Sequence, residues 1–217
     1  MNRGALRDEV FARLGESSGF FTNAQLNQWL QDGVDDLCLA LEPLVNQSTT
    51  NLLTTTNEYA LPSDLISIKR VSQGGSGAWK NLIETKYETL FDQDEDWEDD
   101  TATSPTHWYW RVNPTSGVDI LGVFPKPTTA VTSGLRIYYS YRAATMSADS
   151  STTGLPLWLD RTVVLYALYR CRLKDRDETR AAVAAAEYRA ATNEAARKLQ
   201  KHRKSHAPQL VPQARNY

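Results

Sequence analysis

The sequence has little cysteine and lacks long apolar runs. Only Cys38 and Cys171 occur among the 217 residues, far apart and each inside an apolar helical pattern. This spacing argues against a disulfide framework or a CxxC metal site and predicts two reduced, buried thiols. The longest apolar run, 163–169, is far shorter than the roughly 20 residues of a membrane-spanning helix. The N-terminal residues lack the apolar core of a signal peptide. We therefore expect a protein without a membrane partner, made in a reducing cytoplasm.

Motifs of catalysis and cofactor binding are also missing. The sequence contains no G-x-S-x-G, P-loop or dinucleotide fingerprint. The glycines of 74–77 lack the lysine and following helix of a phosphate cradle, which favours a plain turn. His107 lies among aromatic residues and is expected to pack, while His202 and His206 lie among cations that disfavour a metal ion. We expect no catalytic residue, no cofactor and no metal site, and therefore no enzyme.

Charge is distributed unevenly along the chain. The net charge is only −2, which argues against nucleic-acid binding over the whole surface. An acidic run nevertheless lies just before the middle of the chain, and its members are Asp92, Asp94, Glu95, Asp96, Glu98, Asp99 and Asp100. Crowded loop carboxylates usually form a solvated surface, although a glycosidase pair or a calcium site would use the same residues.

A basic segment lies near the C-terminus and precedes a short proline-containing tail. The basic residues are Arg197, Lys198, Lys201, Arg203 and Lys204, and they also complement the dipole of a helix end. The tail contains Pro208, Leu210, Val211, Pro212 and Tyr217. Such a segment cannot fold alone, but it can dock on a partner by strand addition or in a groove. A disordered terminus is the alternative interpretation.

Helical periodicity predicts four helices at the two ends of the chain. The first spans 2–14, and the second begins after Thr22 as N-cap and stops at Pro43. Gly33 inside the second helix is expected to allow a close helix contact. The third, at 157–174, is apolar nearly all round and should be buried, and the alanine-rich fourth, at 176–203, is expected to be capped by Asp175.

Between the helices the pattern changes to alternating strands. A half-buried strand is predicted near 65–72, a short returning strand at 79–83 and a helical turn at 85–91. In two later strands, one face should be lined by Val118, Ile120, Gly122 and Phe124 and by Leu135, Ile137, Tyr139 and Tyr141, respectively. These elements predict an α+β fold: an α-helical bundle with an inserted antiparallel β lobe and an extended C-terminal arm. The expected domains are 1–46, 47–145, 146–204 and the tail 205–217.

The order of these segments resembles the head-to-tail adaptor (connector) proteins of tailed bacteriophages. The resemblance covers nearly the whole chain and rests on short motifs whose order and spacing are together fairly specific. They are Leu26-Asn-Gln-Trp-Leu30, Glu58-Tyr-Ala-Leu-Pro-Ser-Asp-Leu65, Ser104-Pro-Thr-His-Trp-Tyr-Trp110, the stretch 120–127, Tyr139-Ser-Tyr-Arg142 and Leu155-Pro-Leu-Trp-Leu159.

The resemblance implies a structural virion protein, made in the host cytoplasm and located at the head–tail interface. It implies a homo-oligomeric ring, a dodecamer, that contacts the portal protein above and tail or nozzle proteins below. Genomic DNA would pass through the ring without specific binding. The segment 199–217 would be the portal-docking arm, and the bundle helices would form the ring interface. Acids of 92–100 at the channel or its rim would repel phosphate, a hypothesis based on the acidic run alone.

Two other classes of function stay open. One is a nucleic-acid-binding module that uses the basic helix 197–204, whose affinity would fall steeply with salt. The other is a hydrolase, such as a cell-wall lytic enzyme, in which Glu84, Glu88 or the acidic run supplies the acids.

Overall fold

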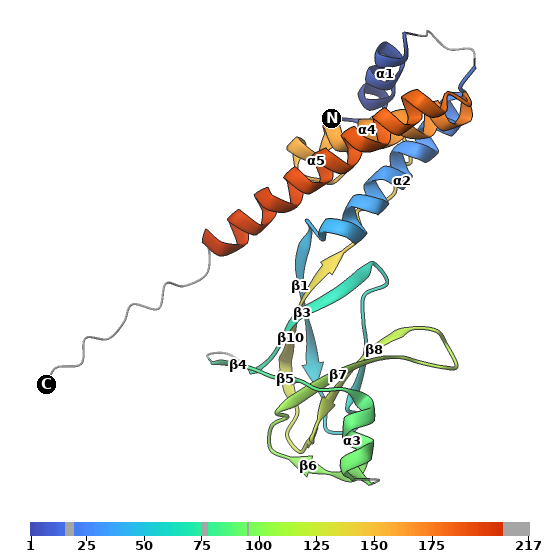
Figure 1. Ribbon diagram of the computed structural model, residues 1–217. Coiled ribbons are helices and arrows are strands. Elements are labelled where there is room, and N and C mark those ends of the chain that lie inside the picture. Colours follow the sequence, from blue (N-terminus) through green and yellow to red (C-terminus); the bar gives the residue numbers. More distant parts are fainter. Residues whose placement is uncertain (16–19, 75–77, 95, 206–217) are drawn as a thin grey trace, which may run out of the picture. The chain divides into compact units, whose positions relative to one another are not determined.

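The chain folds into two compact units, and the second is inserted within the sequence of the first. The computed structural model describes residues 1–15, 20–74, 78–94 and 96–205 (Figure 1). Unit 1 consists of Met1–Pro43 and Ala143–Tyr217, and unit 2 is the continuous stretch Leu44–Arg142 between them. The helices and antiparallel strands confirm the α+β class, and each unit is described by itself below.

Unit 1 is built from helices that pack around α4. The helices are α1 (Arg3–Leu14), α2 (Asn23–Leu41), α4 (Asp160–Lys174) and α5 (Glu178–Ser205), with a 3-10 turn η2 (Leu157–Leu159) before α4. Helix α4 contacts α1, α2 and α5. Its side chains Val163, Val164 and Ala167 are fully buried, and Cys171 is buried too. The predicted central buried helix is therefore confirmed.

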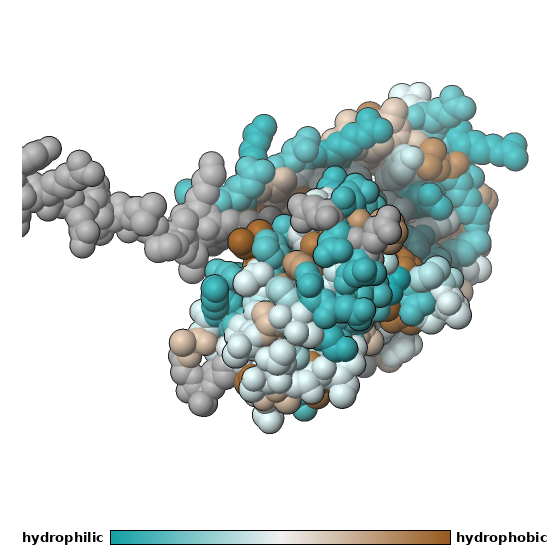
Figure 2. Space-filling model, turned by 90° about the horizontal axis from the view of Figure 1, so that it is seen from below, coloured by the Kyte–Doolittle hydropathy of each residue, from teal (hydrophilic) through white to brown (hydrophobic). Residues whose placement is uncertain are grey.

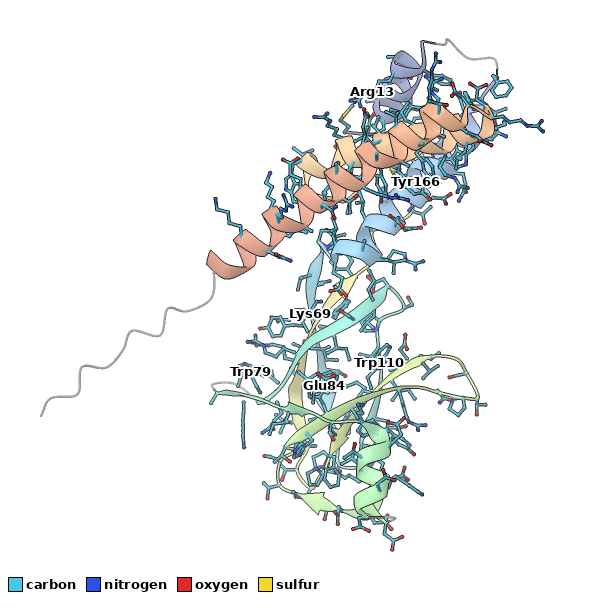
Figure 3. The ribbon with its side chains drawn as sticks, in the orientation of Figure 1. Arg13, Lys69, Trp79, Glu84, Trp110 and Tyr166 are labelled. Atoms are coloured by element: carbon cyan, nitrogen blue, oxygen red, sulfur yellow. The ribbon has the colours of Figure 1, made fainter. Side chains whose placement is uncertain are left out.

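Helix α2 shows why a glycine is tolerated inside a helix. It starts at a capping box in which Thr22 and Gln25 bind each other's backbone N–H groups. A Cβ on Gly33 would lie 3.1 Å from the Cβ of Tyr166 in α4, closer than nearly all real contacts of this kind. The expected close helix contact is confirmed, and Figure 3 shows Tyr166 where α2 and α4 meet.

The junction of α4 and α5 differs from the prediction. Arg176 has a left-handed backbone (φ 58°), which separates α4 from α5. The side chain of Asp177 accepts a hydrogen bond from the Arg180 N–H at 2.9 Å, so Asp177 is the N-terminal cap. The predicted cap, Asp175, ends α4 instead. Both Asp175 and Asp177 have a suitable side chain, and tertiary packing decides between them.

The segment before α4 is held against α1. Asp149 accepts hydrogen bonds from the guanidinium groups of Arg3 and Arg7 at 3.0–3.2 Å. The Gly4 N–H donates to the Asp149 carbonyl, and the Arg3 N–H donates to that of Ser151. The pKa of Asp149 is lowered first by the hydrogen bond from Arg7 and then by that from Arg3. This contact ties the return of the chain from unit 2 to its first helix.

The described residues of unit 2 form ten strands and two short helical segments. The strands are β1 (Val45–Leu52), β2 (Glu58–Ala60), β3 (Leu65–Gly74), β4 (Trp79–Asn81), β5 (Ile83–Glu84), β6 (Thr101–Ala102), β7 (His107–Val112), β8 (Asp119–Phe124), β9 (Lys126–Pro127) and β10 (Val131–Tyr141). The helical segments are α3 (Tyr87–Gln93) and η1 (Trp97–Asp99). In the described residues the sheets have the strand orders β1-β10-β3-β4, β2-β8-β7-β5 and β6-β9.

The first sheet and part of the second share one apolar core. Leu135, Ile137 and Tyr139 of β10 belong to it, and Tyr141 packs against it, which confirms the predicted face of this strand. In β3 the register shifts between Ile68 and Arg70. Because of this bulge, Val71 enters the core instead of Arg70, which strict alternation from Ile66 and Ile68 would place there.

Two strand predictions for unit 2 are wrong in detail. In β8 the predicted Ile120 and Gly122 are buried, but Val118 precedes the strand and is 44% exposed. Leu121 and Val123, on the other face of β8, enter the shared core. Both faces of this central strand are covered, so simple alternation does not apply. The single returning strand expected at 79–83 is two strands in different sheets: β4 pairs with β3, whereas β5 pairs with β7 in parallel.

Val164→Asp should prevent unit 1 from folding. The side chain is fully buried in α4, and an unpaired charge there would cost at least about 3 kcal/mol, a large share of a domain's stability. Val183→Asp on α5 is the matched control, because Val183 is 56% exposed. Thermal melts followed by circular dichroism should show a lost or strongly lowered transition for the first variant only. Equal melting curves would contradict the central role of α4.

Asp149→Asn should lower the melting temperature at neutral pH and not at strongly acidic pH. The folded-state pKa of Asp149 is lowered by Arg7 and Arg3, so its ion pairs stabilise the fold above the unfolded-state pKa of about 3.9. That contribution is lost as the pH falls through the lower folded-state value. A series of melting curves from pH 7 down to pH 2 checks this, because the effect of the substitution should shrink steadily below the unfolded-state pKa. Asp8→Asn is the control, since exposed Asp8 forms no ion pair among the described residues; an equal effect of both variants at pH 7 would contradict the prediction.

Candidate functional site

The basic end of α5 is formed by exposed side chains on the last described turns. Arg197, Lys198 and Lys201 are exposed and lie where the helix dipole favours positive charge. The Lys198 Nζ lies 4.5 Å from the ring centre of Trp158, in η2. The side chains of Arg203 and Lys204 lie outside the described part of the structure. So do residues 206–217, and the docking role of Pro208, Leu210, Val211, Pro212 and Tyr217 stays a prediction.

A groove lies between η2, α4 and α5 and ends at this basic segment. It has a volume of ≈ 480 Å³ and includes Trp158, Leu165 and Ala195 as apolar lining. Arg161, Glu194 and Lys198 supply charges of both signs. Leu157, adjacent to Trp158, is 80% exposed. Sequence analysis missed this groove; the motif Leu155-Pro-Leu-Trp-Leu159 was its one available signal.

The predicted acidic residues gather in one segment of unit 2. Six of them, Asp92, Asp94, Asp96, Glu98, Asp99 and Asp100, are exposed, and Glu95 lies outside the described residues. None of the six forms an ion pair with another described residue. Figure 2 looks onto the end of unit 2 that carries α3 and β6 and shows hydrophilic side chains gathered there.

A buried aromatic side chain anchors the acidic segment. Trp97 is 1% exposed although its neighbours in sequence are acids. Its ring packs edge-on against Tyr87, Tyr109 and Phe124, with centroids 5.5–5.7 Å apart. The packing of the Trp97 ring therefore fixes the turn from which the exposed carboxylates extend.

The polar contacts of Glu58 in β2 are structural. Arg111 binds both carboxylate oxygens, at 2.7 and 2.9 Å, and the Tyr109 hydroxyl donates to Oε1 at 3.1 Å. Burial and the Glu58 charge raise the pKa of Tyr109 far above its usual range. The hydroxyl therefore stays protonated, and the three groups hold β2 and β7 together rather than exchange protons.

Among the described residues, His107 and the two buried cysteines are not part of these surfaces. His107 packs beside Phe124, and its Nδ1 is 2.8 Å from the Thr106 hydroxyl, which agrees with a packing role. Cys38 and Cys171 are both buried. The His202 side chain and all of His206 lie outside the described residues. Within the described part, no three His, Cys, Asp or Glu side chains come together as metal ligands, and no described helix could cross a membrane.

Comparisons with known proteins identify the family. A search of curated proteins gave no match. One similar solved structure is described as the neck of an empty GTA particle computed with C6 symmetry; the match has 15% identity and a TM-score of 0.31, and it covers 77% of this chain and 76% of that chain. A TM-score this low supports no argument. The sequence profile of the SU10 adaptor protein family, in contrast, matches residues 1–213. Because this match spans almost the whole chain, the protein belongs to the SU10 adaptor protein family, and the adaptor resemblance is confirmed.

Proposed function

We propose that this chain is the structural adaptor that joins the head of a tailed phage particle to its tail. The family match over residues 1–213 carries the proposal. The exposed basic end of α5 is consistent with it, since adaptors act through contact surfaces. In this proposal the chain forms a homo-oligomeric ring of twelve copies, located at the head–tail interface of the virion. Genomic DNA passes through the ring without specific binding.

The C-terminal segment supplies the contact with the portal protein. Arg197, Lys198 and Lys201 bring positive charge to the last turns of α5, directly before the tail with Pro208 and Pro212. Basic side chains orient an approach to an acidic partner, and an extended proline-containing segment loses little conformational entropy when it docks. Tail or nozzle proteins bind the opposite side of the ring.

The nucleic-acid-binding alternative has weaker support. Lys198 stacks on Trp158 and shares the groove with Glu187 and Glu194, so the basic helix is flanked by acids that repel phosphate. A net charge of −2 per chain also opposes general attraction to DNA.

Deletion of 208–217 should abolish attachment to the portal protein and leave the fold unchanged. The described helices and sheets end at residue 205, so the melting temperature should stay within a few degrees of the full chain. Electron microscopy of the purified chain mixed with the portal protein from the same genome checks attachment, with coaxially stacked rings as the expected image. The control replaces 208–217 with Gly/Ser of equal length. Unchanged stacking of the deleted form would refute the docking arm, whereas monomers without portal binding in the full chain would refute the adaptor itself.

A further inference from the structure

One face of the first sheet in unit 2 carries two arginines stacked on aromatic rings. The Arg136 Cζ in β10 lies 3.7 Å from the ring centre of Trp79 in β4, and the Arg70 Cζ in β3 lies 4.2 Å from that of Tyr138 in β10. Arg70 is paired with Tyr138 across the sheet, and Arg136 with Ser72. These residues alternate with Leu135, Ile137 and Val71, which enter the core. The arginine–aromatic face, defined by Arg70, Trp79, Arg136 and Tyr138, is therefore the outer face of the sheet.

No described carboxylate neutralises the positive charge of this face by an ion pair. Among the described residues, neither Arg70 nor Arg136 forms an ion pair with a carboxylate. The buried Nε of Arg136 has no hydrogen-bond partner in that part of the chain, and its Nη1 reaches only the Tyr138 hydroxyl, at 3.5 Å. The pKa of Tyr138 is lowered, mainly by this bond from Arg136 and then by Arg70. Two cations thus lie on neighbouring strands without an anion.

Stacking prepares these guanidinium groups for a carboxylate ligand. An aromatic ring covers one flat side of each guanidinium and restricts its rotamers. The N–H donors of Arg70 stay accessible because Arg70 is exposed, whereas Arg136 offers only its outer nitrogens because its Nε is buried. Carboxylates fit such edges in a bidentate manner, and less side-chain entropy is lost because the arginines are already ordered. The face therefore suits an acidic protein segment.

The same unit displays such a segment at a different place. The exposed acids around Trp97 form no ion pair with the described residues, and the buried Trp97 holds their turn in position. Figure 1 shows β4, at the edge of the arginine–aromatic face, well separated from α3 and β6, which flank the acids. Figure 3 places Trp79 at that β4 edge. The two surfaces are complementary in charge but do not meet within one copy.

We propose that the arginine–aromatic face of one copy binds the acidic segment 92–100 of a neighbouring copy. This contact is head-to-tail, so each copy offers one surface to each of two neighbours, and repetition closes a ring or extends a filament. The inference rests on the proposed ring and gives unit 2 a part in its interface. It also assigns the acids to a protein neighbour, in place of the DNA channel that the sequence hypothesis considered. A higher salt concentration should weaken the contact, because the ions screen the attraction between the arginines and the carboxylates.

Charge reversal on each surface tests the proposal. Full-length chain carrying Arg70→Glu and Arg136→Glu should associate at least about tenfold more weakly than wild type. The same loss is expected for a chain in which lysine replaces Asp96, Glu98, Asp99 and Asp100, because these changes turn the net charge of 92–100 from −7 to +1. The chain with all six substitutions should regain association, because every contact again joins opposite charges. An equimolar mixture of the two variants should also regain it. Mass photometry and sedimentation velocity at low and high salt measure these states.

Controls separate this inference from folding defects and from the adaptor proposal. Lys86→Glu with Arg142→Glu makes the same charge change at exposed positions outside the face and should leave association unchanged. Arg70→Glu alone, at an exposed residue, still tests the face if Arg136→Glu impairs folding by circular dichroism. Folded variants that assemble like wild type would overturn the inference alone, whereas wild type that stays monomeric with and without portal protein would overturn the ring as well. Loss of duplex DNA binding with association intact would assign the face to nucleic acid and overturn the proposal.

Discussion

The burial of α4 is the constraint on which unit 1 depends. A helix that is apolar nearly all round must be covered on every side, and α1, α2 and α5 together provide that cover. Two of these helices precede unit 2 in sequence and one follows it. The ends of the chain must therefore meet before α4 is buried, and the Asp149 contacts with Arg3 and Arg7 hold the returning segment in place. Unit 2 can be inserted between the two segments because its own core is separate.

Small side chains set how closely the covering helices approach. Gly33 has no side chain, which leaves room for the Tyr166 ring. Ala181 and Ala195 of α5 are buried. Tyr188 of α5 packs against Tyr166 and donates a hydrogen bond to Asp36 of α2. Burial, and then the hydrogen bond to this carboxylate, raise the pKa of Tyr188 above the usual value for a tyrosine. Only one side of α5 is used in these contacts, so its remaining side, Val183 included, is open to a partner.

Helical periodicity predicted unit 1 well because each helix carries its own signal in sequence. Thr22 as cap, Gly33 as close contact and α4 as buried helix were all predictable from local patterns. The cap of α5 was not, because Asp175 and Asp177 satisfy the same rule and the left-handed Arg176 decides between them. In unit 2, alternation located β10 but failed at the β3 bulge and in β8, which is covered on both faces. Neither a bulge nor burial of both faces produces a regular alternation of apolar and polar residues in the sequence.

Residue types alone could not have located the surfaces of this protein. The acidic run is visible in sequence because its members are consecutive, and only the burial of Trp97 shows that it is a fixed turn. The arginine–aromatic face cannot be recognised in the sequence, because its four residues come from three different strands. The pairing register of these strands brings Arg70, Trp79, Arg136 and Tyr138 together. A catalytic site needs a few groups placed around a reacting atom, whereas an adaptor needs complementary surfaces. In the proposed ring each contact can be modest, because two neighbours hold every copy.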